Sequence, residues 1–466
     1  MRCVPSPSRV FTSVAVALSL SACNGNSGLN PTPSLSAANH ASSWHNPNPR
    51  LHRASSSPIQ HVVIIVQENR SFNNLFMGFP GAKTSTYGYT SDNQKITLQP
   101  IGLETTWDID HSSNSFFAAC NGTGSYPGTD CQMNGFNNEW VGCGGRGQSS
   151  CPNPHPQYSY VPKSETKPYF QMAKQFVLAD EMYASNFDAS SFISHQYIIS
   201  GQAEGAVNYP WSYWGCPGGG SDEIAEVGPQ RQIPNGYETV CWDPNTLGDE
   251  LDAAGLSWGF YTSTYYGDGG IWSAYQAVNH IYNGPDWSKD IITPQNKFLS
   301  DVSGGKLRTV SWVTPTCANS DHAGCGGNTG PSWVTSLVNS IGESQYWNNT
   351  AIFVFWDDYG GWYDSEAPAL ADYDGLGLRI PMLIISAYAK KDHVSHVHYE
   401  HGSILRFIED NFGLGQLSAS DQRATSPAAD AFNFKKPPRK FKQIKAPHGK
   451  EYFMHQAVDQ RIPDWE

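Results

Sequence analysis

Positive charge is scarce in this sequence. The 466 residues include 29 lysines and arginines against 42 aspartates and glutamates, which gives a formal net charge of −13. Nucleic-acid binding needs basic side chains that neutralise phosphates, so the composition disfavours that function. The one basic run, Lys435 to Lys445, is short and interrupted by Pro437 and Pro438, and we interpret it as a solvated face.

Several catalytic and metal-binding signatures are also absent. No C-x-x-C pair occurs, which disfavours a zinc site, and neither an H-E-x-x-H nor a G-x-S-x-G sequence is present. A zincin-type protease and an esterase with a nucleophile elbow are therefore unsupported. There is no internal repeat and no second long linker, and the length fits one large α/β domain or two smaller ones.

The N-terminus has the pattern of an export signal. Val10 to Leu20 is an apolar stretch, preceded by two arginines, that is too short to span a membrane. It leads into Leu20-Ser21-Ala22-Cys23, which resembles a bacterial lipobox with Cys23 as the lipidated residue; ordinary cleavage at a small residue is the alternative. We predict a lipoprotein-type signal peptide over residues 1–23, a flexible tether over residues 24–57, and a protein anchored at the cell envelope or secreted.

Cysteine usage agrees with export. Apart from Cys3 and Cys23, eight cysteines form an even set in glycine-rich, loop-like sequence, which is typical of disulfides. Eight cysteines allow many pairings. Pairing between sequence neighbours would close four short loops, Cys120 with Cys131, Cys143 with Cys151, Cys216 with Cys241 and Cys317 with Cys325.

Continuous apolar segments of strand length alternate with helical patterns. Segments that are apolar at every position suit strands covered on both faces, as in a parallel sheet. The predicted strands are Val62–Val66, Leu256–Tyr261, Leu307–Val313, Ile352–Phe355 and Met382–Ile385, and the predicted helices include Leu247–Ala254, Trp333–Ile341 and Ser403–Phe412. This alternation indicates an α/β fold with a doubly wound, mostly parallel sheet flanked by helices.

Polar side chains follow two of these strands. The residues concerned are Glu68, Asn69, Asp357 and Asp358. Open α/β sheets bind ligands at the carboxyl ends of their strands, and grouped carboxylates repel unless a cation lies among them. Oxygen ligands suit Mg²⁺, Ca²⁺ or Mn²⁺, although Zn²⁺ also accepts carboxylates, so the pattern predicts one divalent metal ion. The structural alternative pairs Glu68 with Arg70 and makes the Asp pair a cap.

A serine and three histidines could supply the remaining chemistry. Ser190 and Ser191 directly precede a helical segment, Phe192–Ser200, whose N-terminal N–H groups and dipole favour an anion. A hydroxyl beside a cation loses its proton more easily, although a plain N-cap is the alternative. The histidines that could bind phosphate oxygens or protonate a leaving group are His111, His322 and His401.

Together these segments resemble a bacterial phosphoesterase family that contains non-haemolytic-type phospholipases C and a group of acid phosphatases. The resemblance covers about residues 58 to 445 and rests on ordered motifs, among them HVVIIVQENRSFNNLF, SSFISHQYIISG, SDHAG, WNNTAIFVFWDDYGGWYD and HGSILRFIEDNFGL. It implies an alkaline-phosphatase-like fold and one catalytic domain over residues 58–466.

The resemblance also implies roles for single residues. It implies a metal site formed by Glu68, Asn69, Asp357 and Asp358, a nucleophile at Ser191, phosphoryl or leaving-group contacts by His111 and His322, and an open role for His401. Two departures stand out: the family's Gly-Pro turn is absent before the serine, which leaves Ser190 as a competitor, and Asp364-Ser365-Glu366 replaces Asp-His-Val.

The expected function is metal-dependent hydrolysis of a phosphate ester through a serine nucleophile. We favour phospholipase C-type cleavage of a phosphodiester by a lipid-anchored protein, with an acid phosphatase acting on small monoesters as the alternative. A non-catalytic envelope lipoprotein that keeps the fold as a binding module is a third possibility. The sequence leaves the oligomeric state open.

Overall fold

The computed structural model describes residues 57–145, 149–210, 214–218, 222–263, 270–459 and 461. The predicted signal peptide and nearly all of the predicted tether lie outside these residues. Within the described part, no helix is long and apolar enough to cross a membrane.

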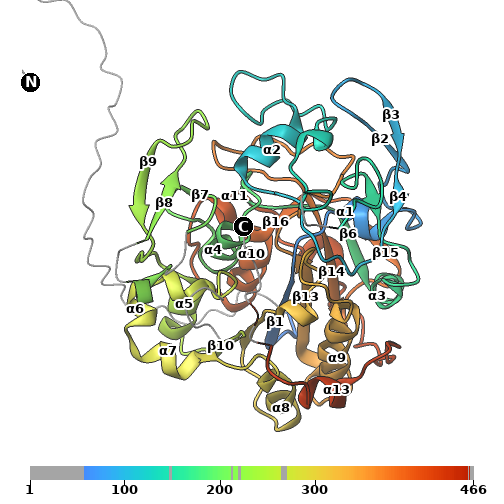
Figure 1. Cartoon of the computed structure of the whole chain (residues 1–466). Coiled ribbons are helices and arrows are strands. Elements are labelled where there is room, and N and C mark those ends of the chain that lie inside the picture. The colour runs from blue at the N-terminus through green and yellow to red at the C-terminus, as the bar shows by residue number, and fades with distance from the viewer. Residues whose placement is uncertain are drawn as a thin grey trace, which may run out of the picture. The chain divides into compact units, whose positions relative to one another are not determined.

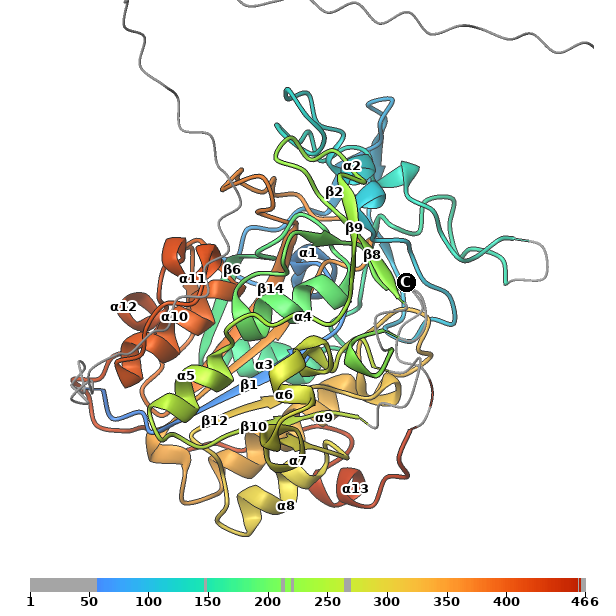
Figure 2. The ribbon, with the colours of Figure 1, turned by 90° about the vertical axis from the view of Figure 1, so that its left-hand side faces the viewer.

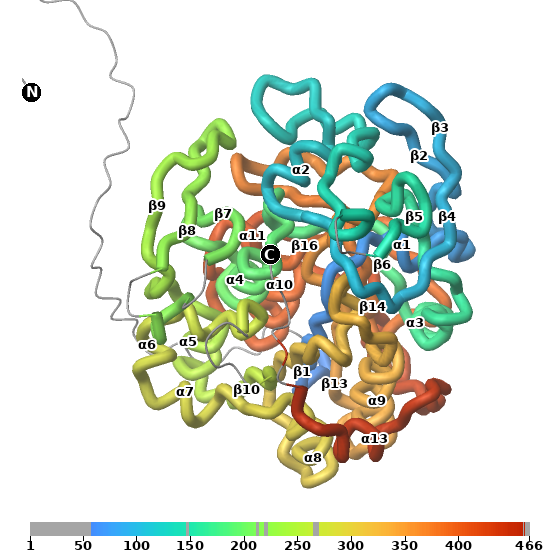
Figure 3. The backbone as a smooth tube through the Cα atoms, in the orientation of Figure 1, coloured from blue at the N-terminus to red at the C-terminus, as the bar shows by residue number. Residues whose placement is uncertain are grey.

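A nine-stranded sheet forms the centre of the described chain (Figure 1). Its order is β11-β10-β12-β1-β13-β14-β6-β15, and β16 also pairs with β6. The strands are β1 (His61–Gln67), β6 (Val177–Tyr183), β10 (Trp258–Tyr261), β11 (Ile291–Ile292), β12 (Val310–Val313), β13 (Thr350–Trp356), β14 (Arg379–Ser386), β15 (His393–Ser395) and β16 (Tyr399–Glu400). Figure 3 shows β1 beside β13, although almost 300 residues separate them in sequence.

The sheet is mostly parallel, as predicted, with one exception. β14 contains the predicted strand Met382–Ile385 but runs antiparallel to both of its neighbours, β13 and β6. An unbroken apolar run reports burial on both faces, and β14 is buried along its whole length, but burial does not fix the direction of a strand. β6 escaped prediction because Asp180 and Glu181 interrupt its apolar pattern.

Helices cover both faces of the sheet (Figure 2). α4 packs against α5 and α10 on one side, and α3 packs against α9 on the other. The helices are α1 (Phe72–Phe76), α2 (Ser113–Cys120), α3 (Lys167–Gln175), α4 (Ser191–Ser200), α5 (Leu247–Ala253), α6 (Asn279–Tyr282), α7 (Pro285–Asp290), α8 (Lys297–Ser303), α9 (Gly330–Gly342), α10 (His401–Phe412), α11 (Ala419–Arg423), α12 (Ala428–Ala431) and α13 (Lys450–Met454). The predicted α/β fold with flanking helices is confirmed.

In the described ranges, three small sheets lie outside the central one. Their strands are β2 (Tyr87–Tyr89) with β3 (Lys95–Thr97), β4 (Gln99–Pro100) with β5 (Ser159–Tyr160), and β7 (Ala206–Val207) with β8 (Glu223–Glu226) and β9 (Gly236–Thr239). α2 and the hairpin β2–β3 lie at the top of the view in Figure 1, and α8 and α13 lie at the bottom.

The four predicted disulfides are all present. They join Cys120 to Cys131, Cys143 to Cys151, Cys216 to Cys241 and Cys317 to Cys325. The last closes the loop that carries His322, and the first follows the helix that begins just after His111. One of the predicted catalytic histidines, His322, therefore lies in a covalently closed loop.

Candidate active site

The site begins where β1 and β13 end side by side. Gln67 is opposite Trp356 in the parallel register, so Glu68 and Asp357 leave the sheet at the same edge. Asn69 follows in the left-handed backbone region, at a φ of 55°, which is uncommon for a residue other than glycine. Its backbone N–H donates to Asp357 Oδ1 at 3.0 Å, and the backbone N–H of Arg70 donates to the carbonyl of Asp358 at 3.0 Å. The two strand ends therefore hold each other in place.

Two glycines allow this close approach. Gly360 and Gly361 have φ angles of 61° and 71°. A Cβ at Gly360 would lie 2.3 Å from the carbonyl oxygen of Asn69, and one at Gly361 would lie 2.2 Å from a side-chain carbon of Ile109. The Gly-Gly pair after the Asp pair is thus required by space and by backbone conformation together.

Three buried side chains form a candidate metal site. Glu68 Oε1 lies 3.1 Å from His195 Nε2, which lies 3.9 Å from Asp357 Oδ2. One ligand atom of each residue lies within 4.8 Å of the others. Asp357 Oδ2 is buried and has no hydrogen-bond partner in the described chain, which is costly unless a cation is its partner. Two carboxylates and an imidazole form a donor set that fits a divalent metal ion.

His195 was missed as a ligand by the sequence analysis. It lies four residues after Ser191 on α4, and residues at this spacing share a helix face. This spacing could have identified His195 as a site residue, because a serine that faces the site places His195 on the same face of the helix. No local pattern indicates that its partners are Glu68 and Asp357.

The other two predicted ligands lie on the serine side of the site. Asn69 Nδ2 lies 3.1 Å from Ser191 Oγ and 3.2 Å from Asp358 Oδ2, and Ser191 Oγ lies 3.4 Å from Asp358 Oδ2. Asp358 also accepts a hydrogen bond from the N–H of Gly360 through Oδ1, at 2.7 Å. Part of the structural alternative therefore holds, because Asp358 braces the turn while its other oxygen faces Ser191. Metal binding by Asn69 and Asp358 stays a prediction.

Ser191 is the first residue of α4, and Ser190 is its N-cap. Ser190 is buried, and its Oγ makes no hydrogen bond within the described chain. The hydroxyl group within reach of Asn69 and Asp358 is that of Ser191. This geometry favours Ser191 over Ser190 as the reactive serine.

His111 closes the group around Asn69. Its Nδ1 lies 2.6 Å from the carbonyl of Ile109, which requires a donor, so Nε2 of the neutral ring accepts a hydrogen bond from Asn69 Nδ2 at 2.8 Å. The rings of His111 and His322 lie 5.9 Å apart between centroids. The two histidines predicted to act on a phosphoryl group are therefore neighbours, although they come from distant segments.

His401 lies on the metal side and not beside the serine. Its Nδ1 accepts a hydrogen bond from the N–H of Ser185 at 3.5 Å, and its ring packs on Phe355. Burial lowers the pKa of His401 to about 4, against the attraction of Asp357, which raises it. The ring is thus neutral at ordinary pH, and Nε2 has no hydrogen-bond partner among the described residues.

Arg70 does not pair with Glu68. Its guanidinium donates to the carbonyls of Asp321 and Leu103, each at 2.8 Å, and stacks 4.5 Å from the centre of the Trp362 ring. Burial lowers its pKa from 12.5 to about 10. This part of the structural alternative is wrong, and Arg70 instead fixes the loop before His322.

Asp321 completes that support. Its N–H donates to Gln67 Oε1 at 2.9 Å, and its carboxylate accepts from the Tyr169 hydroxyl at 2.8 Å and from Trp356 Nε1 at 3.1 Å. Desolvation raises the pKa of this carboxyl to about 6. The end of β1, the end of β13 and the loop of His322 are therefore joined by buried hydrogen bonds.

The segment that departs from the family pattern has a structural role. Asp364 is buried, accepts from Arg379 Nε at 2.9 Å and accepts from the N–H of Asn73 in α1 at 2.9 Å. Arg379 also lies 4.6 Å from the centre of the Phe72 ring. Asp364 thus ties the loop after β13 to the helix that follows β1.

An α/β sheet whose strand ends gather buried carboxylates, an imidazole and a helix-N-terminal serine is typical of a hydrolytic enzyme. The family model described as "Phosphoesterase family" matches residues 59–415, and the chain belongs to this family, whose members hydrolyse phosphate esters.

Named relatives include phospholipases C at low identity. The chain is 23% identical to the non-hemolytic phospholipase C of Burkholderia pseudomallei, over 83% of this chain and 60% of that protein. It is 23% identical to phospholipase C B of Mycobacterium tuberculosis, over 82% and 78% of the two chains, and 22% identical to non-specific phospholipase C1 of Arabidopsis thaliana, over 77% and 67%. The chain thus spans only about 60% of the length of the Burkholderia protein.

Solved structures with some similarity include an alkaline phosphatase superfamily protein from Vibrio parahaemolyticus, with a TM-score of 0.35, 11% identity and coverage of 78% of this chain and 69% of that chain. Another is a phosphonate monoester hydrolase from Silicibacter pomeroyi, with a TM-score of 0.31, 11% identity and coverage of 60% and 73%.

Proposed function

We propose that this protein cleaves phosphodiesters of phospholipids, in the manner of a phospholipase C, with Ser191 as the nucleophile. The observation that carries the proposal is the position of Ser191 Oγ at the start of α4, 3.1 Å from Asn69 Nδ2 and 3.4 Å from Asp358 Oδ2. The names of the relatives support the diester substrate, since each of those quoted is a phospholipase C.

The residues around the serine have distinct tasks in this proposal. Asn69 orients the hydroxyl, and Asp358 Oδ2 is within reach of its proton. The N-terminal N–H groups of α4, with the helix dipole, favour the negative charge of a phosphoryl group held at Ser191. His322 protonates the leaving oxygen, and His111, beside it, holds Asn69 in place through Nε2 next to the phosphoryl group.

Glu68, His195 and Asp357 would hold one divalent metal ion. When bound, the ion supplies positive charge that offsets the developing negative charge and lowers the pKa of a nearby hydroxyl. His401 packs behind Asp357 as a neutral ring and, in this scheme, positions that ligand without touching the substrate.

We also propose that the protein is exported by its predicted signal peptide and anchored through Cys23. The four disulfides support an oxidising compartment. Globomycin treatment of expressing cells, with a Cys23→Ala control, tests the anchor. Treatment should increase the uncleaved precursor of the wild-type chain and should leave the Cys23→Ala variant unchanged.

The catalytic proposal is tested by a pair of neighbouring variants. Ser191→Ala should lower the rate of hydrolysis by at least about a thousandfold without changing the unfolding temperature, because it removes the group that attacks phosphorus. Ser190→Ala is the matched control and should retain most activity. An active Ser191→Ala variant, or an equally inactive Ser190→Ala variant with normal stability, would contradict the assignment.

The substrate class is decided by comparing two esters. Purified protein should be assayed on phosphatidylcholine and on an aryl phosphate monoester, each with chelator and after divalent metal is restored. Preference for phosphatidylcholine supports the phospholipase C, and preference for the monoester supports an acid phosphatase with the same residues. Hydrolysis of neither ester with any metal, while phosphate is still bound, identifies a non-catalytic binding module.

A further inference from the structure

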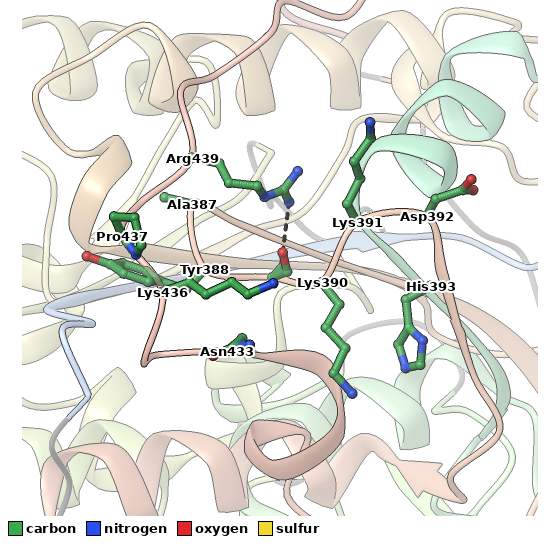
Figure 4. Close-up of a pocket in the computed structure, with 11 residues that line it drawn as sticks. Ala387, Tyr388, Lys390, Lys391, Asp392, His393, Asn433, Lys436, Pro437 and Arg439 are labelled. Carbon is green, nitrogen blue, oxygen red and sulfur yellow. Dashed lines mark hydrogen bonds between the residues drawn. The ribbon is translucent and has the colours of Figure 1, made fainter.

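A second cavity lies at one end of the strands of the central sheet, and the candidate active site lies at the other end. β14 ends at Ser386, beside β13 residue Ala351, whereas the candidate site follows Trp356 at the other end of β13. At about 3.3 Å per residue, the length of β13 separates the two edges by roughly 20 Å. The cavity has a volume of about 560 Å³ and is lined by residues from two segments, 387–393 and 433–439 (Figure 4). We call it the basic pocket.

The basic pocket concentrates positive charge in an acidic protein. Its lining includes four cationic side chains, those of Lys390, Lys391, Lys436 and Arg439. The run from Lys435 to Lys445 contains six of the chain's 29 lysines and arginines and no carboxylate. The acidic residue of the lining is Asp392, whose carboxylate points away from Lys436 and Arg439 in Figure 4.

Part of this charge is neutralised within the protein. Lys390 Nζ lies 3.2 Å from Asp430, and His393 Nε2 lies 2.9 Å from the other oxygen of the same carboxylate. In Figure 4 the side chains of Lys390 and His393 extend to the same side, away from Arg439. The charges of these two residues and of Asp430 are paired with one another, so they need no bound ligand.

The remaining cations have no such partner. Lys391 and Lys436 make no ion pair with any carboxylate in the described ranges, and neither does Arg439. Arg439 is held rigidly, because it donates to the carbonyls of Gln175 at 3.0 Å and Ala389 at 2.8 Å and lies 5.0 Å from the centre of the Phe176 ring. Its Nε–H is buried and makes no hydrogen bond within the described chain. Burial lowers the pKa of Arg439, with no carboxylate to oppose it.

The backbone explains why two of these cations extend together. Pro437 and Pro438 separate Lys436 from Arg439, and proline favours an extended backbone with three residues per turn. Residues three apart then share a side, and Figure 4 shows Lys436 and Arg439 extending in the same direction toward the 387–390 segment. The N–H of Arg439 donates to the carbonyl of Ala387 at 2.9 Å, which fixes this arrangement.

We propose that the basic pocket is a second anion site that binds a phosphate group through the ammonium groups of Lys391 and Lys436, beside the positive charge of Arg439. A rigid guanidinium beside two uncompensated ammonium groups matches the charge and the acceptor oxygens of phosphate. The group is carried either by a soluble phosphate compound or by the headgroup of an anionic phospholipid. The site is separate from the candidate active site, so it does not depend on the proposed reaction.

The position of the pocket bears on the source of the phosphate. β1 begins at His61 beside Thr350, and the N–H of Gln60 donates to the carbonyl of Asn349, so the described chain starts at the same edge of the sheet as the pocket. An anchor at the predicted lipidation site would join the domain at this edge. A lipid headgroup would then be within reach of the pocket.

Inorganic phosphate is the first probe. Equilibrium dialysis of the metal-loaded full chain should detect two classes of site, one of them the candidate active site. The Lys391→Gln/Lys436→Gln variant should lose the second class, with binding weakened at least about tenfold, and should hydrolyse ester at the normal rate. Arg439 is left unchanged because it also holds two carbonyls.

The matched control is Lys442→Gln/Lys445→Gln, which removes the same charge from the run of residues 435–445, outside the pocket lining. It should keep both classes of site. Equal phosphate binding by the wild type and Lys391→Gln/Lys436→Gln, or an equal loss in the control, would overturn the proposal, because either result leaves the pocket without a specific role.

Vesicles distinguish the two sources. Sedimentation with phosphatidylglycerol vesicles, against phosphatidylcholine vesicles, should be compared for the same three proteins. If Lys391→Gln/Lys436→Gln loses both phosphate and phosphatidylglycerol binding, the pocket takes a lipid headgroup. If it loses phosphate binding alone, the pocket takes a soluble phosphate compound.

Discussion

At the scale of single residues, Asn69 and His195 belong to two different parts of the candidate site. Asn69, in the left-handed region, turns its amide toward Ser191, His111 and Asp358, each within 3.2 Å of Nδ2. His195 lies on the other side with Glu68 and Asp357. One strand end thereby serves both halves, with Glu68 facing the candidate metal site and Asn69 facing the serine.

The role of His195 can be tested by metal affinity. His195→Gln should weaken binding of the divalent ion by at least about tenfold, because the amide is a poorer ligand than imidazole and the two carboxylates would be left without their third partner. Metal content after dialysis, measured by mass spectrometry, reports the change.

His393→Gln is the control for that experiment, since His393 pairs with Asp430 at the far edge of the sheet and should not alter metal content. Full metal content in His195→Gln would rule out the proposed triad and direct attention to Asn69 and Asp358 as ligands instead.

At the scale of elements, a loop closed by a disulfide presents His322 to the strand ends. The loop of residues 317–325 is closed by its own disulfide, and Asp321 within it bonds to Gln67, Trp356 and Tyr169. His322 therefore has its backbone fixed on both sides. A histidine that must reach a leaving group benefits from such restraint, because little conformational freedom is left to lose on binding.

Removing this disulfide should impair catalysis beyond its effect on stability. Cys317→Ser/Cys325→Ser should lower kcat about tenfold or more, because the loop of His322 gains freedom. The Cys143–Cys151 disulfide has the same sequence separation of 8 residues, so its loss has a similar entropic cost, roughly 2–3 kcal/mol in the free energy of unfolding.

Cys143→Ser/Cys151→Ser is therefore a matched control for stability. It should lower the unfolding temperature by a similar amount while keeping kcat near that of the wild type. Equal kcat values for the two double variants would show that closure of the 317–325 loop serves stability alone.

At the scale of the whole molecule, buried acidic side chains couple stability to pH. Glu250 on α5 and Glu409 on α10 lie near each other and near Asp421 on α11. Desolvation, followed by repulsion from these neighbours, raises the pKa of Glu409 from 4.5 to about 9 and that of Glu250 to about 7. The folded protein keeps these protons at pH values where the unfolded chain releases them.

The free energy of unfolding should therefore fall as the pH rises from about 4.5 toward 9, since the folded state binds more protons throughout this range. Thermal unfolding at pH 5, 7 and 8.5 should show a decreasing midpoint. Glu409→Gln keeps a neutral side chain at every pH. Between pH 5 and 8.5 its unfolding midpoint should therefore fall by a few degrees less than that of the wild type.

Glu451→Gln is the control, because Glu451 is exposed on α13 and its charge should have little effect on the pH dependence. A Glu409→Gln variant with the same pH dependence as the wild type would mean that other groups govern it.

Much of the architecture was readable from local sequence. The apolar runs predicted β1, β10, β12, β13 and β14, and the cysteine spacing indicated all four disulfides. The polar residues after two strands predicted where the candidate site lies. These features depend on burial, short-loop closure and chain order, which neighbouring residues largely decide.

Tertiary structure decided which groups meet. The pairing of residues 61–67 with 350–356, the antiparallel course of β14, the joining of His195 to Glu68 and Asp357, and the gathering of Lys391, Lys436 and Arg439 around one cavity all link segments far apart in sequence. Their physical cause is long-range packing and strand register, to which no local pattern of residues corresponds.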